Sequence, residues 1–462
     1  MESNVTPRAG DGSVPRALIV GVRLPGTDNQ DFDSGLEELE RLVKTLGYEP
    51  VGRVTQLRET LSPAAVLGDG KLKELADLTG GSGRTAPSIP RKPTKAQLRF
   101  RAEAGETDDD AAEPPSADEK PRIALVAVDH ELSPSQLRNL ERAAGTQVLD
   151  RAGVIIEIFS QRARTREARL QVEMARLAYL APRVRESPSG KERQAGRGAG
   201  EAAIELDRRR IRDRMAELRE QLEAVQREQS VRRTQRRTLR RVALVGYTNA
   251  GKSSLMRALT GSAVEVEDKL FATLDTTVRA LKPEVKPRVL VSDTVGFIKK
   301  LPHDLVASFK STLDEALEAS LLLFVVDASD PNWEAQLKVT REVVLEIGAH
   351  DTPSRVVMNK LDRVPPEERA VLARAQPDAW FISAHDAADV ARVHEGIVAF
   401  FESRYVTAEL VVPYSQQNLV SEMHESGRVE REAYEEDGVH VRFRGDSETI
   451  GRLREKLTPA RG

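Results

Sequence analysis

The sequence predicts an α/β protein whose central domain is a P-loop domain with a mostly parallel, doubly wound sheet. Strand-like and helix-like segments alternate along most of the chain, which is typical of a parallel sheet covered by helices. A glycine-rich phosphate-binding motif follows directly on a short apolar strand expected at residues 242–245. Polar residues end the strand-like segments that come next, and ligands bind at such strand ends in doubly wound sheets.

The bulk composition excludes several classes of protein. A length of 462 residues predicts about three folded units, and 39% apolar with 31% charged residues excludes wholesale disorder. The absence of cysteine excludes disulfides, thiolate nucleophiles and cysteine metal sites, and the seven histidines show no metal-ligand spacing. Because no apolar run reaches the about 20 residues of a membrane span and no secretory signal is present, we expect a soluble, cytoplasmic protein.

The N-terminal region predicts a small α/β domain. Two capping-box patterns, a serine with Glu or Gln three residues later, predict helix starts at Ser34 and Ser133, and Pro134 stands at the first helical position after Ser133. The other expected elements are strands at 16–22, 48–56 and 122–128 and helices at 71–78 and 152–180.

Residues 80–120 differ sharply in composition from their surroundings. Six Lys or Arg and no acid occur between Arg84 and Arg101, and eight acids and no base occur between Glu103 and Glu119. Together with many Gly, Pro, Ala and Ser residues, this pattern predicts a disordered insertion in the N-terminal domain.

An arginine-rich segment precedes the P-loop domain. After a loop at residues 187–200, residues 207–241 are almost wholly helix-forming and hold 13 arginines against 6 acids. Two interpretations stay open, a solvated helical hairpin or a contact with the phosphate backbone of a nucleic acid. The net charge of -3 and the aromatic content of 4% give no sign of a protein that stacks bases.

The phosphate-binding motif has the pattern G-x-x-x-x-G-K-S and is expected to open a helix. Its glycines let backbone N–H groups approach phosphate oxygens, Lys252 neutralises their charge, and Ser253 offers a hydroxyl to Mg²⁺. The motif consists of Gly246, Tyr247, Thr248, Asn249, Ala250, Gly251, Lys252 and Ser253.

The strand expected at residues 288–292 ends in Asp293, Thr294, Val295 and Gly296. The carboxylate of Asp293 can hold Mg²⁺ indirectly, through a ligand of the ion, and the N–H of Gly296 can bond a γ-phosphate. These are the residue types that a nucleoside triphosphate site requires at this place.

The next two strand ends predict a guanine site. The strand at 354–358 leads into Asn359, Lys360, Leu361 and Asp362. Asp362 can accept two hydrogen bonds from guanine, and adenine lacks the amino group that donates one of them, so we expect GTP rather than ATP. Asn359 supports this loop and Lys360 covers the purine. After a strand at 380–382, Ser383 and Ala384 bring a backbone N–H to the guanine oxygen.

Taken in order, these motifs resemble the HflX family of translation-factor-class GTPases. The likeness is carried by GYTNAGKSSL, LFATLDTT, DTVGF, NKLD and ISA, and it is closest in Phe271, Ala272, Thr273, Leu274 and Asp275. Residues 129–141 and 148–183 are similar to the family's N-terminal domain and joining helices. The resemblance implies that Thr273 meets Mg²⁺ only when a γ-phosphate is present. We assign the catalytic roles to Lys252, Gly296 and Thr273.

The resemblance also implies a partner and a role. It implies binding to the large ribosomal subunit and its RNA, stimulation of GTP hydrolysis there, and splitting or rescue of stalled ribosomes. A GTP-dependent scaffold for ribosome assembly or RNA maturation is the alternative, and a non-hydrolysing nucleotide-binding domain also stays open. The guanine site disfavours a metabolic nucleotide kinase. Residues 198–203 read GAGEAA where the family has GPGETQ, and the insertion is foreign to the family domain.

The hydrolysis machinery lacks one expected side chain. Phe297 stands where many regulatory GTPases carry the glutamine that orients the attacking water, and a phenyl ring cannot do this. Asn249 occupies the position where potassium-activated relatives hold a monovalent cation, which makes K⁺ a candidate cofactor beside Mg²⁺. The alternative is that Asn249 only suits the turn of the loop.

The C-terminal region predicts a small α+β domain. We expect a strand at 408–412, a helix at 416–425 and a strand pair turning at residues 437–438, with His424 and His440 as ordinary surface or packing residues. The predicted organisation is a disordered start at 1–15, an N-terminal HflX-type domain at 16–185 with the insertion at 80–120, a loop and arginine-rich helical linker at 186–241, a GTPase domain at 242–403, and the C-terminal domain at 404–462. The sequence does not indicate an oligomeric state.

Overall fold

The computed structural model describes seven stretches of the chain, and they divide into two compact units. The described residues are 14–85, 123–183, 199–234, 240–261, 270–271, 277–299 and 317–457. The first unit comprises residues 1–158 and 176–213, and the second comprises residues 159–175 and 214–462. Among the described helices, none has the length and apolar character that crossing a bilayer requires.

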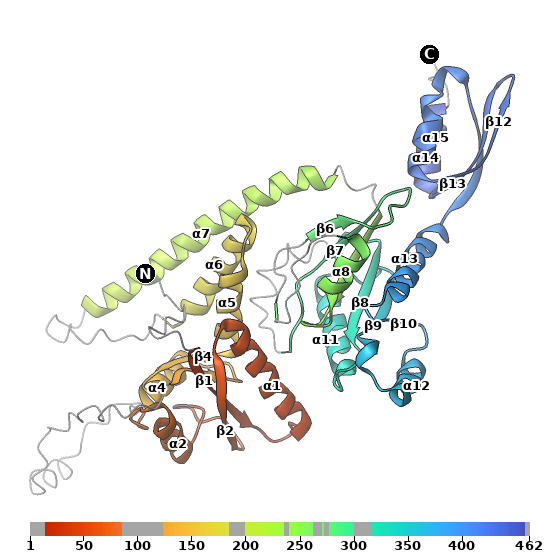
Figure 1. Cartoon of the computed structure of the whole chain (residues 1–462). Helices are drawn as coiled ribbons and strands as arrows, with labels where there is room; N and C mark the ends of the chain where they lie inside the picture. Colours follow the sequence, from red (N-terminus) through yellow and green to blue (C-terminus); the bar gives the residue numbers. More distant parts are fainter. Residues whose placement is uncertain are drawn as a thin grey trace, which may run out of the picture. The chain divides into compact units, whose positions relative to one another are not determined.

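The first unit is built on a parallel sheet of four strands in the order β2-β1-β3-β4 (Figure 1). Helix α1 covers one face of this sheet, and α2 and α4 pack side by side on the other. The central strands β1 and β3 are buried along almost their whole length, as parallel strands between two helical layers must be. The elements are β1 (Arg16–Arg23), α1 (Asn29–Leu46), β2 (Glu49–Leu57), α2 (Asp69–Thr79), β3 (Ile123–Val128), α4 (Pro134–Ala144) and β4 (Gln147–Asp150).

One of the two predicted helix caps is confirmed and the other is wrong. Ser133 caps α4 with both bonds of a capping box, because its hydroxyl accepts from Gln136 N and the Gln136 side chain accepts from Ser133 N. Ser34 lies inside α1, which begins five residues earlier, at Asn29, after Asp28 in extended conformation. A serine followed by an acid three residues later also occurs on the surface of a continuing helix, so the spacing alone does not fix a start.

The single helix expected at residues 152–180 is two helices. Helix α5 (Arg151–Arg162) and helix α6 (Arg166–Leu180) are separated by residues 163–165. The hydroxyl of Thr165 accepts a hydrogen bond of 3.1 Å from Ala168 N, so a side chain takes over the role of a helical carbonyl at the start of α6. Apolar periodicity continues across such a break, which is why the pattern did not reveal it.

A buried ion-pair cluster ties the first unit together. Arg151 at the start of α5 is 3% exposed and donates to Glu38 of α1 at 2.6 Å and to Asp129, just after β3, at 2.9 Å. Its guanidinium also donates to the carbonyl of Gly35. Removing one partner of such a buried group leaves an uncompensated charge and costs about 3–5 kcal/mol. The cluster therefore fixes how α1 and α5 meet the sheet.

The arginine-rich segment forms one long helix, and the hairpin interpretation is wrong. Helix α7 runs from Ala199 to Thr234 without interruption, whereas Arg240 and Arg241 belong to the following strand. In its first half several exposed arginines pair with acids of the same helix, such as Arg210 with Asp207 at 3.2 Å. The excess of arginine is therefore concentrated after residue 226, where the sequence holds seven arginines and one acid up to residue 241.

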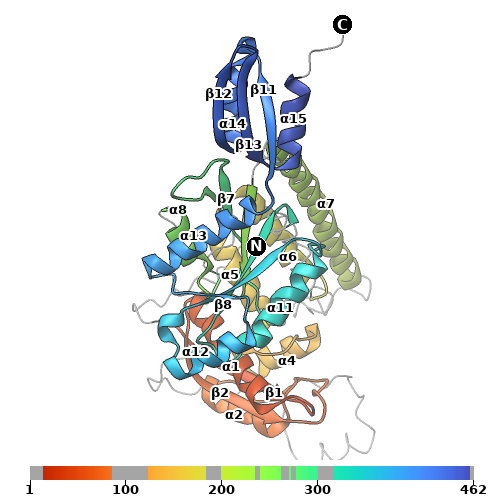
Figure 2. The same cartoon turned by 90° about the vertical axis from the view of Figure 1, so that its right-hand side faces the viewer.

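The second unit contains the predicted doubly wound sheet, in the order β10-β9-β8-β5-β7-β6 (Figure 1). All neighbouring strands are parallel except β6 and β7. Helices α8 and α13 pack together on one face, and α11 packs on the other (Figure 2). The elements are β5 (Arg240–Gly246), α8 (Lys252–Thr260), β6 (Thr277–Ala280), β7 (Val289–Asp293), β8 (Leu321–Asp327), α11 (Trp333–Glu346), β9 (Ser354–Asn359), α12 (Pro366–Ala375), β10 (Trp380–Phe381) and α13 (Ala387–Glu402).

The C-terminal residues form the predicted small α+β structure (Figure 2). Its antiparallel sheet has the order β11-β13-β12, and two helices cover one face around Met423, Phe443 and Leu453. As expected, His424 and His440 lie at the surface, each beside a carboxylate. The elements are β11 (Val406–Val412), α14 (Asn418–Ser426), β12 (Arg428–Glu435), β13 (Gly438–Gly445) and α15 (Ser447–Leu457).

Candidate nucleotide site

The phosphate-binding motif forms a loop between β5 and α8 in which both glycines are sterically required. A Cβ on Gly246 would collide with the carbonyl oxygen of Val325, and one on Gly251 would collide with the side-chain amide of Asn359. Gly251 also has φ 92°, in the left-handed region that side chains rarely adopt. The first helical turn of α8 leaves its N–H groups facing this loop, which makes it an anion site.

The side chain of Lys252 lies inside the phosphate loop and bonds to its backbone. Its ammonium is buried and donates to the carbonyl oxygens of Gly246, at 3.1 Å, and Tyr247, at 2.8 Å. Burial lowers the pKa of Lys252 to about 8, and the charge of Asp293 opposes this shift. The phosphate charge of a nucleotide would favour the protonated form of the lysine.

The two predicted magnesium residues of the described chain lie next to each other. The hydroxyl of Ser253 donates to Asp293 at 2.7 Å, and Asp293 is fully buried at the end of β7. A hydroxyl and a carboxylate oxygen beside a phosphate loop are ligands that fit Mg²⁺. Thr294 fixes the chain just beyond, because its hydroxyl donates to Leu244 of β5 at 2.8 Å.

Residues 295–297 lie directly on the phosphate loop. Phe297 N donates to the Gly246 carbonyl at 3.1 Å, and Thr248 N donates to the Phe297 carbonyl at 2.8 Å. A Cβ on Gly296 would come within 2.8 Å of Thr248 and 3.0 Å of the Lys252 ammonium, so only glycine fits. The ring of Phe297 is 2% exposed, which agrees with the expectation that it does not orient water.

Tyr247 gives this contact a second anchor that the sequence did not reveal. Its hydroxyl accepts a 2.5 Å hydrogen bond from the N–H of Lys299, just after the Asp293–Gly296 segment. The sequence placed Tyr247 in the phosphate-binding motif, but the pattern carries no prediction for the hydroxyl of its side chain.

Asn359 connects the guanine loop to the phosphate loop. It is 1% exposed, donates to the carbonyl of Ala250 at 2.9 Å, and accepts from Ala384 N at 3.0 Å. One buried amide thus joins the phosphate loop to the residues that follow β9 and β10, as expected of a side chain that supports this loop.

Lys360 is held by a residue that the sequence analysis missed. Its ammonium pairs with Asp327, the last residue of β8, at 2.7 Å, and both side chains are largely buried. The other oxygen of Asp327 accepts from the N–H and the hydroxyl of Ser329. The sequence held a usable signal for Asp327, because it is an acid at the end of a buried parallel strand and the same argument identified Asp293.

The predicted base-binding groups lie together after β9 and β10. Asp362 is exposed, and a hydrogen bond from the Ser383 side chain holds the pKa of its carboxyl below the usual range. The structure differs from the expectation for the two N–H groups. Ser383 N donates to the partly buried Asp389 at 2.7 Å, and Ala384 N donates to the buried Asn359, so both donors already have partners within the protein.

The segment at 271–275 is only partly described. Phe271 has φ 55° and is 2% exposed, and its ring meets that of Phe159 edge to face at 4.6 Å between centroids. Its side chain therefore packs in an apolar environment. Ala272, Thr273, Leu274 and Asp275 lie outside the described residues.

Comparisons with known proteins agree with this geometry. Residues 241–360 match a family described as 50S ribosome-binding GTPase, and residues 162–236 match the GTP-binding GTPase middle region. Residues 33–85 and 111–160 match the GTP-binding GTPase N-terminal family. GTPase HflX of Gluconacetobacter diazotrophicus is 59% identical over 445 residues, which are 96% of this chain and 98% of that protein.

The chain belongs to the HflX family of GTPases. GTPase HflX of Escherichia coli is 35% identical over 420 residues, 89% of each chain. The crystal structure of a GTP-binding protein from Sulfolobus solfataricus in complex with GDP aligns with a TM-score of 0.42 and 20% identity over 83% of this chain and 99% of that one. The HflX N-terminal match leaves out residues 86–110, within the predicted insertion.

Proposed function

We propose that this HflX family GTPase is a switch that works on the large ribosomal subunit and takes part in splitting or rescuing stalled ribosomes. The observation that carries the proposal is the match of residues 241–360 to a family described as 50S ribosome-binding GTPase. The phosphate loop, the Ser253 to Asp293 pair and the guanine loop support the nucleotide half of the proposal.

Each residue of the site has a role in this proposal. The N–H groups of the loop and Lys252 bind the phosphates, and the N–H of Gly296 bonds the γ-phosphate. Ser253 and Thr273 coordinate Mg²⁺, with Asp293 behind Ser253, and the ion neutralises charge on the phosphates. Asp362 accepts from guanine, while Asn359 and Lys360 build the pocket around the base.

The arginine-rich end of α7 and the residues after it supply the proposed contact with ribosomal RNA. Residues 227–241 hold seven arginines and one acid, so the segment attracts phosphate even though the chain as a whole has a net charge of -3. Aromatic residues are too scarce for recognition by base stacking, so the contact reads phosphate and shape.

Sedimentation with two kinds of particle tests the proposal. With a non-hydrolysable GTP analogue we expect the chain to sediment with mature large subunits, to do so less with GDP, and to lose binding as salt rises. Stronger binding to precursor particles than to mature subunits would favour the assembly scaffold instead. Nucleotide-independent or salt-independent binding contradicts the proposed switch.

We also propose that K⁺ beside Asn249 supplies positive charge during hydrolysis. Asn249 has φ 61°, which asparagine tolerates, so the backbone alone accounts for the residue type and the cation role needs its own test. We expect faster GTP hydrolysis in K⁺ than in Na⁺ at equal ionic strength.

Two variants separate the amide of Asn249 from the backbone. Asn249→Gly keeps the left-handed conformation without the amide, and Asn249→Ala removes the amide with added strain. Both should remove the preference for K⁺ while Asn249→Gly preserves GTP affinity. Equal rates in the two salts for the unchanged protein reject the cation.

A further inference from the structure

A second cavity lies at the edge of the GTPase sheet where β5 and β7 begin, opposite to the edge that carries the phosphate loop. It has a volume of about 380 Å³ and opens beside Arg240 and Val289, the first residues of β5 and β7. The phosphate loop follows the other end of β5, which is seven residues long, so about 20 Å of strand separates the two places. The cavity is therefore distinct from the nucleotide site.

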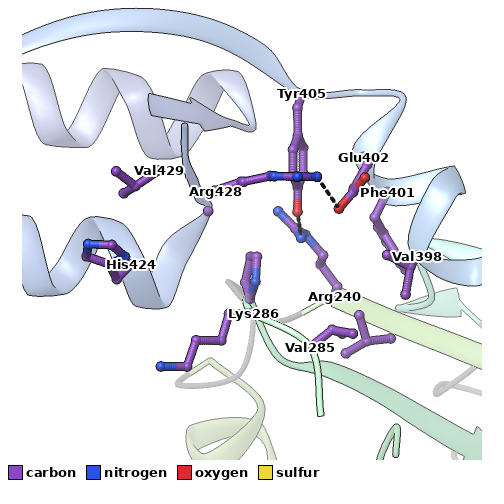
Figure 3. A pocket seen from close by; sticks show the side chains of 13 residues that line it. Arg240, Val285, Lys286, Val398, Phe401, Glu402, Tyr405, His424, Arg428 and Val429 are labelled. Atoms are coloured by element: carbon purple, nitrogen blue, oxygen red, sulfur yellow. Dashed lines mark hydrogen bonds and ion pairs between the residues drawn. The ribbon is translucent and has the colours of Figure 1, made fainter. Parts of the chain in front are cut away.

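The cavity is closed by two parts of the chain. The GTPase side contributes the turn between β6 and β7 and the end of α13, and the C-terminal side contributes the end of α14 and the start of β12. Figure 3 shows Arg428 pointing toward Tyr405 and Glu402, above Arg240, whose guanidinium bonds the Tyr405 hydroxyl, with His424 and Lys286 on the left. A ligand held there would touch both parts at once.

The lining combines an apolar floor with an excess of positive charge. Val285, Val289, Val398 and Phe401 form apolar surface in the cavity. The lining holds Arg240, Lys286 and Arg428 against Glu402, and Asp446 beside the lining pairs with Arg240 at 3.5 Å, which leaves a net charge of +1 with His424 counted as neutral. Ligand pockets of this size are typically apolar with a few convergent polar groups that set specificity.

The two arginines differ in how firmly they are held. Arg240 is 11% exposed, and its guanidinium donates to the Tyr405 hydroxyl, lies 4.5 Å from the centre of the Tyr405 ring and is 3.5 Å from Asp446. Arg428 is 62% exposed and is only loosely paired, at 3.9 Å from Glu402. Arg240 is thus a fixed cation at the base of the cavity, and Arg428 is free to close on a ligand.

We propose that this cavity binds a nucleotide through its phosphate, with the sugar and base resting on the apolar floor. Guanidinium groups bind phosphate oxygens in pairs of hydrogen bonds, which suits the loosely paired Arg428, while Arg240, already bonded to Tyr405 and Asp446, adds positive charge at the base of the cavity. An anion between them replaces the weak pairing of Arg428 with Glu402. The nucleotide is either free in solution or part of an RNA chain, since both present the same chemistry. The inference does not rest on the ribosomal role.

The test uses the full chain saturated with GDP and Mg²⁺, so that the first site is filled. Cytidine 5′-monophosphate serves as the probe because the guanine site rejects a pyrimidine, and inorganic phosphate and a short single-stranded oligoribonucleotide are measured beside it by calorimetry. We expect one additional site per chain for the nucleotide, with inorganic phosphate weaker. Binding of the oligonucleotide alone, weakened by Arg428→Gln, would assign the cavity to RNA, and binding of the mononucleotide alone would assign it to a free ligand.

Variants with matched controls show whether the binding belongs to this cavity. Arg428→Gln and Lys286→Gln should each weaken binding about tenfold, the loss of one charge-assisted contact. Arg431→Gln removes an exposed arginine of the same strand outside the cavity and should change nothing. The proposal is overturned if no probe binds the GDP-saturated chain, if inorganic phosphate binds as tightly as the nucleotide, or if the Arg428 and Arg431 variants behave alike.

Discussion

Single buried side chains position the base-binding loop, and the exposed Asp362 makes the proposed choice of base. Asn359 could be predicted in its supporting role because the motif places it at the end of a buried strand. Its two partners could not be predicted, since Ala250 and Ala384 approach it through tertiary structure. The pairing of Lys360 with Asp327 joins residues 33 positions apart in sequence, and no local pattern connects them.

Asp362→Asn should change the base preference from guanine to xanthine. The new amide donates where the carboxylate accepted, and xanthine carries an oxygen at the position of guanine's amino group. We expect GTP affinity to fall by about a hundredfold or more and xanthosine triphosphate to bind instead. Because Asp362 is exposed, the thermal unfolding of the variant should be unchanged. Unaltered GTP affinity in this variant would remove the assignment of the guanine loop.

Asp327→Asn should loosen the base pocket without affecting the phosphate end. The charged partner of Lys360 is lost, and a hydrogen bond to a charged group contributes about 1.5–3 kcal/mol. We expect the affinities for GTP and GDP to fall together by about tenfold, measured by nucleotide dissociation rates. Asp330→Asn is the control, because this acid lies in the same loop and bonds Asn332 and Gln336 instead. A change confined to GTP would contradict the positioning role.

At the scale of the elements, apolar strands were predictable and helix limits were not. Buried parallel strands leave continuous apolar runs, so β1, β5, β7 and β9 appear in the sequence within one or two residues of their limits. Where a helix starts depends on which of several polar residues adopts a non-helical conformation and caps it. At the start of α6 the cap is a single threonine hydroxyl, that of Thr165. The sequence could not distinguish one long helix from a helical hairpin, because the charged residues of α7 occur on all of its faces.

The two serines of the predicted capping boxes should respond differently to alanine. Ser133→Ala removes a cap from α4 and costs about 1 kcal/mol. Ser34→Ala changes a residue inside α1, five positions after its start, and should leave the protection of the first turn of α1 unchanged. Amide hydrogen exchange of each helix measures the effect locally, which avoids the unfolding of several domains at once. Equal destabilisation by the two changes would contradict the observed start of α1.

At the scale of the whole molecule, one rule of topology allowed the position of the nucleotide site to be predicted from the sequence. The ends of β5, β7, β9 and β10 lie along one edge of the sheet, so motifs more than 100 residues apart could be placed together in advance. The second cavity follows no such rule, because its residues come from turns and helix ends without a shared motif. The proposed switch joins the nucleotide site to a ribosomal partner, and that coupling is the central claim.

Steady-state GTP hydrolysis with increasing concentrations of purified large ribosomal subunits tests this claim most directly. In the described part of the site, the position after Gly296 holds the buried Phe297, which cannot orient water, so the isolated chain should be slow. We expect the subunits to raise the rate by about tenfold or more, to saturation, and the Asp362→Asn variant to show the same stimulation only with xanthosine triphosphate. A rate that stays constant over the whole range of subunit concentrations, while the chain binds GTP normally, would contradict the account.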